Sequence, residues 1–147
     1  MTGALVVVAL LAGAVLPMQA AINAQLRYAV GSPVLAALIS FSVGTLSLLV
    51  YALVVRAPQP DSRLIAQAPW WVWSGGVLGA AYVFAAVVVT PRLGVAALLG
   101  LALAGQSIAA LVMDHYGLLG LAVRPLGWER IAGVLCLAVG VVLISRH

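Results

Sequence analysis

The chain has 147 residues, of which 65% are hydrophobic and 7% are charged, and its mean hydropathy is +1.23. This composition leaves too little polar surface to cover a water-soluble globule, so the sequence predicts an integral membrane protein. The net charge of +4 comes from arginines, and no basic patch with interleaved aromatic residues is present. These features exclude a nucleic-acid-binding surface and indicate that the arginines contact lipid headgroups.

Long apolar segments without alternating polarity predict an all-α membrane fold, because backbone amides in hydrocarbon must be satisfied within the segment. We expect five transmembrane helices in a single domain, 1–147, at about residues 5–26, 33–55, 70–89, 95–113 and 128–144. Ser32 is expected to cap the second helix, with Pro33 in its first turn. The third helix is expected to end before Pro91.

The arginines divide almost evenly between the two sides of the membrane if each segment crosses once. One side then carries Arg56, Arg63, Arg124 and Arg130, and the other carries Arg27, Arg92 and Arg146. Arginines in short loops set the orientation of a membrane protein, so the absence of bias predicts insertion both ways up. Two antiparallel copies would reproduce the inverted repeat of secondary transporters, with a site near the middle of the membrane.

Uncharged polar side chains lie near the middle of several expected helices. Gln19 is roughly 5 Å from the middle of the first helix and Gln106 roughly 3 Å from that of the fourth. Asn23 shares the face of Gln19, and Tyr82 lies near the middle of the third helix. Such groups need partners in hydrocarbon, so they either hydrogen-bond between helices or line a substrate cavity. Both interpretations stay open at this point.

Three further positions indicate helix shape and assembly. Pro17 removes a helical hydrogen bond and predicts a bend in the first helix just before Gln19. Gly133 and Gly140 lie on one side of the last helix and predict a groove for a partner helix in the dimer.

The ionisable residues cluster at expected helix ends. Asp114 and His115 end the fourth helix and form a candidate proton gate. A pairing of Glu129 with Arg130 or of Asp114 with Arg124 at these ends would be ordinary surface electrostatics and contribute little. The sequence contains no catalytic triad, zinc motif or phosphate loop, so neither an enzyme nor a bound cofactor or metal is expected.

Segments spread along the whole chain resemble the YdcZ-like family of the drug/metabolite transporter superfamily. They are Met18–Leu26, Gly31–Pro33, Phe41 with Gly44 and Thr45, Pro69–Trp71, Gly75–Gly76 with Gly79–Ala80, Pro91–Gly94, Ala104–Gln106 and Asp114–Gly117. The resemblance implies a five-helix half-transporter of the inner membrane that works as a dual-topology chain, a pair of chains or a fused protein. The last helix also resembles the dimerisation groove of the small multidrug resistance proteins. Unlike them, this chain has no carboxylate in its first helix.

The leading hypothesis is a transporter that works by alternating access as an antiparallel homodimer in lipid. An uncharged, amide-rich cavity lined by Gln19, Asn23, Tyr82 and Gln106 suits a neutral, zwitterionic or aromatic solute better than a bare cation. Two alternatives remain: a membrane scaffold that does not transport, and one half of a heterodimeric transporter.

Overall fold

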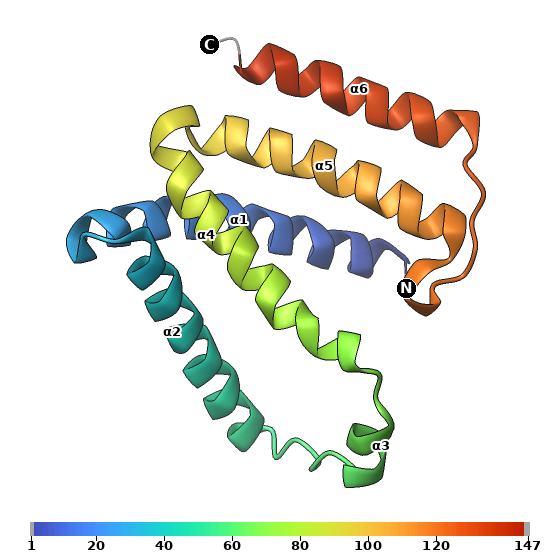
Figure 1. Ribbon diagram of the computed structural model, residues 1–147. Helices are drawn as coiled ribbons and strands as arrows, with labels where there is room; N and C mark the ends of the chain where they lie inside the picture. The colour runs from blue at the N-terminus through green and yellow to red at the C-terminus, as the bar shows by residue number, and fades with distance from the viewer. Residues whose placement is uncertain (1, 146–147) are drawn as a thin grey trace. The chain divides into compact units, whose positions relative to one another are not determined.

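The computed structural model describes residues 2–145, which form helices joined by short connections (Figure 1). The elements are α1 (Thr2–Val30), α2 (Pro33–Val54), α3 (Ser62–Gln67), η1 (Trp70–Ser74), α4 (Gly75–Leu93), α5 (Val95–Tyr116), η2 (Leu118–Gly120) and α6 (Trp128–Ser145). Arg146 lies outside the described residues, so its place on one side of the membrane stays a prediction.

The chain divides into two compact units, and both divisions fall beside a proline. One unit contains Met1–Pro17 and Arg92–His147, and the other contains Met18–Pro91. Pro17 lies inside α1 and Pro91 inside α4. Each of these helices therefore contributes residues to both units, and the predicted bend at Pro17 stays a prediction.

Local sequence signals explain how α2 begins. Ser32 has an extended backbone, and its hydroxyl accepts a hydrogen bond from the amide of Leu35 at 3.4 Å. Pro33 follows in the first turn, where a missing amide hydrogen costs nothing because that amide has no helical partner. The predicted cap at Ser32 is confirmed.

The prediction that the third helix ends before Pro91 is wrong, because α4 continues to Leu93. Proline fixes φ near the helical value, so the last turn of a helix can continue through it, although its ring crowds the carbonyl four residues earlier and the hydrogen bond to that carbonyl is lost. The first turn of this segment also differs from the expected α-helix. Residues Trp70–Ser74 form the 3₁₀ helix η1, and the polar connection before them contains the short helix α3.

Small side chains form the core of the unit Met18–Pro91. Ala36 and Ala37 of α2 pack with Val83 and Val87 of α4, and Val87 is fully buried. Partly buried side chains surround this cluster, namely Leu26, Val30 and Tyr82. In this unit α2 and α4 run alongside one another in opposite directions, connected through α3 (Figure 1).

Helices α5 and α6 lie side by side in the other unit (Figure 1). A Cβ atom added to Gly100 of α5 would lie 3.1 Å from Cγ2 of Val141, so the absence of a side chain lets α6 approach closely. Gly117 ends α5 with φ of 61°, and a Cβ there would lie 2.7 Å from Cγ2 of Val123. Glycine is therefore required at the turn that starts the connection to α6.

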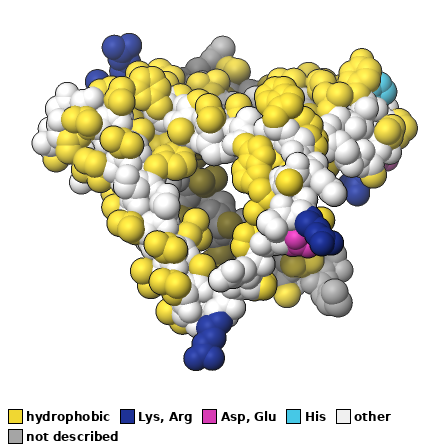
Figure 2. All heavy atoms as spheres, turned by 60° about the horizontal axis from the view of Figure 1, so that its bottom comes forward, with side chains coloured by type: hydrophobic (Ala, Val, Ile, Leu, Met, Phe, Trp, Pro, Cys, Tyr) yellow, Lys and Arg dark blue, Asp and Glu magenta, His cyan; other side chains and the backbone are white. Residues whose placement is uncertain are grey.

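Most large apolar side chains of the described chain are exposed, including Leu48 at 71% and Leu53 at 70%. Hydrophobic side chains cover much of the face in Figure 2, with few arginines among them. Four helical segments are long and apolar enough to cross a membrane: Gly3–Val30, Pro33–Val54, Trp70–Leu93 and Val95–Tyr116. Helix α6 is not among them, so the fifth crossing stays a prediction.

Candidate functional site

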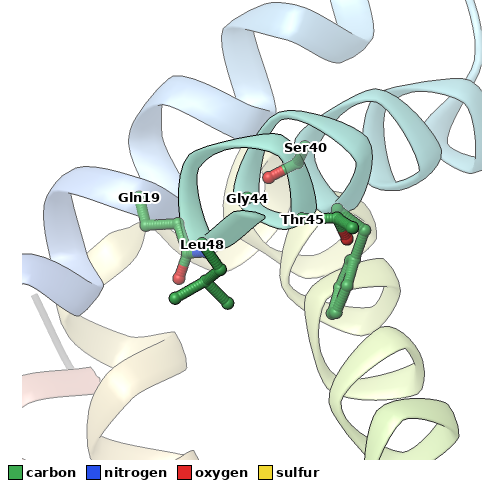
Figure 3. A pocket seen from close by; sticks show the side chains of 6 residues that line it. Gln19, Ser40, Gly44, Thr45 and Leu48 are labelled. Atoms are coloured by element: carbon green, nitrogen blue, oxygen red, sulfur yellow. The ribbon is translucent and has the colours of Figure 1, made fainter. Parts of the chain in front are cut away.

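A groove with a polar wall lies between α1 and α2, near the middle of both helices. Its volume is about 190 Å³, and its lining residues are Gln19 of α1 with Ser40, Phe41, Gly44, Thr45 and Leu48 of α2. In Figure 3 Gln19 extends from α1 beside Leu48, and Ser40 and Thr45 belong to α2. Counted along α1, Gln19 is roughly 4.5 Å from the helix midpoint. The groove therefore places a primary amide at the depth of the hydrocarbon.

The polar groups of this groove are available to a ligand. Ser42 and Ser47, outside the groove, donate to backbone carbonyls one turn earlier at 2.9 and 2.8 Å. Within the described residues no hydrogen bond engages the side chains of Gln19, Ser40 or Thr45. No charged side chain lines the groove. It offers uncharged donors and acceptors beside an aromatic ring.

The other predicted substrate-binding residues do not line this groove. Asn23, one turn after Gln19 in α1, is 4% exposed, and Tyr82 packs against the alanine and valine core. Gln106 is exposed on α5 and belongs to the other compact unit. The structure thus places Gln19, Asn23 and Tyr82 in one unit, with Gln19 alone of these three in the groove.

Sequence reasoning missed most of the groove. As a sequence pattern, Ser40 and Gly44 indicate a small-residue stripe for helix packing, Phe41 and Thr45 belong to the family resemblance without an assigned role, and Leu48 carries no signal of its own. The spacing of Ser40, Gly44 and Leu48, with each four residues from the next, places them on one face of α2. That spacing together with a hydroxyl at Thr45 is the signal that could have found the groove.

An arginine joins the end of α1 to α4 in the same unit. The Nη1 atom of Arg27 donates to the carbonyl oxygen of Val87 at 3.3 Å. In a regular helix the amide of residue 91 would bind that carbonyl, but Pro91 has no amide hydrogen. Arg27 therefore supplies a hydrogen bond that the proline has removed, and it is half-buried. Arg27 therefore has a structural contact in addition to its charge at the end of α1.

In the described chain the side chain of Asp114 does not pair with that of Arg124. Asp114 Oδ2 instead accepts from Arg130 Nη2 at 2.7 Å, which ties the end of α5 to the first turn of α6. The backbone amide of Arg124 donates to the backbone carbonyl of Asp114 at 2.8 Å. The loop turns back at Gly117 and brings the Arg124 backbone, rather than its side chain, to Asp114.

His115 also holds this connection. Its Nδ1 atom accepts from the amide of Leu126 at 3.3 Å, and its ring lies edge-on to Tyr116 with centroids 4.8 Å apart. A proton on Nδ1 would remove the acceptor. Asp114 and His115 thus both contact the loop before α6, and their role as a proton gate stays a prediction.

The predicted dimer residues lie on α6. A Cβ added to Gly133 or Gly140 would meet no described atom within 4 Å. Val141, next to Gly140, is the α6 residue that is buried, and it contacts Gly100 of α5. Packing within the described part of the chain therefore leaves Gly133 and Gly140 uncovered.

The family model described as "Putative inner membrane exporter, YdcZ" matches residues 4–143. The curated "Inner membrane protein YdcZ" of Escherichia coli (strain K12) is 31% identical to the chain over 85 residues. This match covers 58% of the chain and 56% of the relative, so the chain spans little more than half of that relative's length. No solved structure matches the chain. The chain therefore belongs to the YdcZ family and is a multi-pass protein of the inner membrane.

Proposed function

We propose that the chain is a half-transporter that moves a small uncharged or zwitterionic organic solute by alternating access. The observation that carries the proposal is the groove of Gln19, Ser40 and Thr45, whose polar groups have no partner among the described residues. Unpartnered amides and hydroxyls at membrane depth are costly unless a ligand or a second subunit satisfies them. A family of membrane exporters supports transport as the general activity.

The absence of charge in the groove favours this solute class over cations. Binding a bare cation in hydrocarbon requires a carboxylate or a closed shell of oxygens. No carboxylate lines the groove, and Asp61, Asp114 and Glu129 all lie at helix ends. A neutral or zwitterionic solute can instead exchange its hydrogen bonds with water for bonds to Gln19 and the hydroxyls.

Two antiparallel copies with five crossings each would form the complete transporter. Support comes from the even distribution of arginines and the open glycine face of Gly133 and Gly140, together with the predicted odd number of crossings. In such a dimer Asn23, Tyr82 and Gln106 of both copies are further candidates for contact with the solute.

Transport is tested in liposomes that contain the purified protein. Uptake of labelled phenylalanine and of labelled uncharged solutes is compared with that into empty liposomes. For a solute that is transported, Gln19→Ala and Gln106→Ala should each lower the rate at least tenfold. Gln25→Ala is the matched control, because Gln25 is an exposed amide on α1 outside the groove. Normal transport by folded Gln19→Ala would refute the groove as the binding site. A folded protein that transports none of the solutes would favour the scaffold hypothesis.

Orientation is tested by cysteine accessibility in intact cells. Cys136 is replaced by Ser, and Ser62→Cys provides an exposed thiol in the connection between α2 and α4. A membrane-impermeant maleimide should label roughly half of the molecules from outside if the chain inserts both ways up. Labelling of all molecules or of none would eliminate dual topology, and a stable functional dimer of this chain alone would eliminate the heterodimer.

A further inference from the structure

A second groove lies along α2 and shares Phe41 with the polar groove. Its volume is about 270 Å³, and its lining residues are Val34, Ala37, Leu38 and Phe41 of α2 with Ala80 and Phe84 of α4. None of these side chains carries a polar group. A polar groove toward α1 and an apolar groove toward α4 therefore meet at one aromatic residue.

The ring of Phe41 lies beside a glycine of α4. A Cβ added to Gly79 would lie 3.6 Å from Cζ of Phe41, an ordinary van der Waals distance, so the ring lies close to the backbone of α4 at this residue. Phe41 is still 37% exposed, and this free surface lines the grooves. The residue is roughly 4 Å from the midpoint of α2, at nearly the same depth as Gln19.

The volumes favour a single site over two. Pockets for small organic molecules hold about 300–1,000 Å³ and are mostly apolar, with a few polar groups that fix the orientation of the ligand. The grooves of 190 and 270 Å³ each fall below that range, and together they fall within it. Three polar side chains beside a largely apolar wall also match the usual composition of such a pocket.

We propose that the two grooves form one binding site for an amphipathic, uncharged solute, and that Phe41 determines its specificity. The proposal rests on the transport function above and names the class of its substrate. A carboxamide, carbonyl or hydroxyl head of the solute binds Gln19, Ser40 and Thr45, while an aromatic or alkyl part packs on Phe41 and Phe84. An acyl chain of a lipid in the same place would leave the polar side chains without partners.

The test uses 4-benzoylbenzamide, a photoreactive benzophenone that carries one primary amide. The purified protein in lipid nanodiscs is irradiated with the probe, and mass spectrometry locates the adducts. Adducts are expected on α2 between Val34 and Leu48, on α4 between Ala80 and Phe84, and on α1 near Gln19. Excess 4-benzylbenzamide, which has the same primary amide and two aromatic rings but no photoreactive ketone, should suppress all of them.

Two variants separate the role of Phe41 from general apolar contact. Phe41→Ala should weaken the apparent affinity of the probe about two- to tenfold, the range expected for losing one aromatic contact. Phe41→Leu keeps most of the volume without the flat ring and should weaken it as well. Leu46→Ala is the control, since Leu46 is 61% exposed on α2 and lines a different groove. Circular dichroism verifies that each variant is folded.

Three results would overturn the proposal: adducts spread evenly over the exposed apolar surface, equal labelling by benzophenone without the amide, or equal loss of affinity in Phe41→Ala and Leu46→Ala. The first two would indicate that the probe partitions like a lipid chain. A failure of the transport proposal would give a different experimental result. If the protein labels as expected but moves no solute in liposomes, the binding-site proposal stands and the transport proposal is refuted.

Discussion

The contact of Arg27 with the Val87 carbonyl predicts a specific dependence on Pro91. Arg27→Met should destabilise the protein, because the buried carbonyl loses a donor that Pro91 cannot replace. A hydrogen bond to a charged group contributes about 1.5–3 kcal/mol when well formed. The distance of 3.3 Å is long and Arg27 is only half-buried, so we expect a loss of about 1–2 kcal/mol.

The decisive measurement is the same substitution in a Pro91→Ala background. Alanine at position 91 restores an amide hydrogen that can bind the Val87 carbonyl within α4. Arg27→Met should then cost less than about 0.5 kcal/mol, which gives a coupling of about 1 kcal/mol between the two positions. The free energy of unfolding is measured by circular dichroism in mixed micelles of dodecyl maltoside and sodium dodecyl sulfate.

Arg92→Met is the matched control, since Arg92 follows Pro91 and its side chain is exposed. It should change the free energy of unfolding by less than about 0.5 kcal/mol in either background. An equal cost of Arg27→Met in the Pro91 protein and in the Pro91→Ala background would refute the reasoning. The arginine would then act through its charge or its aliphatic stem rather than by replacing the bond lost at the proline.

Four other substitutions test the packing and the ion pair of the described chain. Thr90→Val should raise the free energy of unfolding by about 1 kcal/mol in the same micelle assay, because Thr90 Oγ1 is buried without a hydrogen-bond partner in the described residues; a loss would indicate a partner for the hydroxyl. Gly117→Ala should cost at least about 2 kcal/mol by the same assay, and Gly120→Ala about 1 kcal/mol, since both have positive φ but only Gly117 is crowded; equal costs would contradict this. Asp114→Asn should cost at most about 1 kcal/mol, because its ion pair with Arg130 is partly exposed, and a thermal melt showing a much larger loss would contradict this.

The sequence was most informative where a signal is local or chemically out of place. Ser32 and Pro33 predict the start of α2 from adjacent residues alone, and the cap is formed as expected. Gln19 attracts attention because a primary amide in an apolar segment requires an explanation, and it does line a groove. Both inferences depend on one residue and its immediate neighbours.

What the sequence could not predict depends on contacts between distant segments. Phe41 is an apolar residue in an apolar helix, and its position between two grooves depends on where α1 and α4 pack against α2. Pro91 usually predicts the end of a helix, but α4 continues past it. The partner of Asp114 depends on how the loop turns at Gly117, which no spacing between charges reveals.

The unit that holds the groove has a core of small side chains, and this bears on how its helices can move. Ala36, Ala37 and Val87 present low, smooth surfaces, so neighbouring helices interlock less deeply than they would through leucine or phenylalanine. Shear between packed helices proceeds by small displacements that keep side chains near their rotamers. Shallow contacts lower the barrier to such sliding, so rigidity near the groove has to come from a few discrete attachments. The hydrogen bond of Arg27 to α4 is one such attachment, and losing it would leave the small side chains as the main contact between these helices.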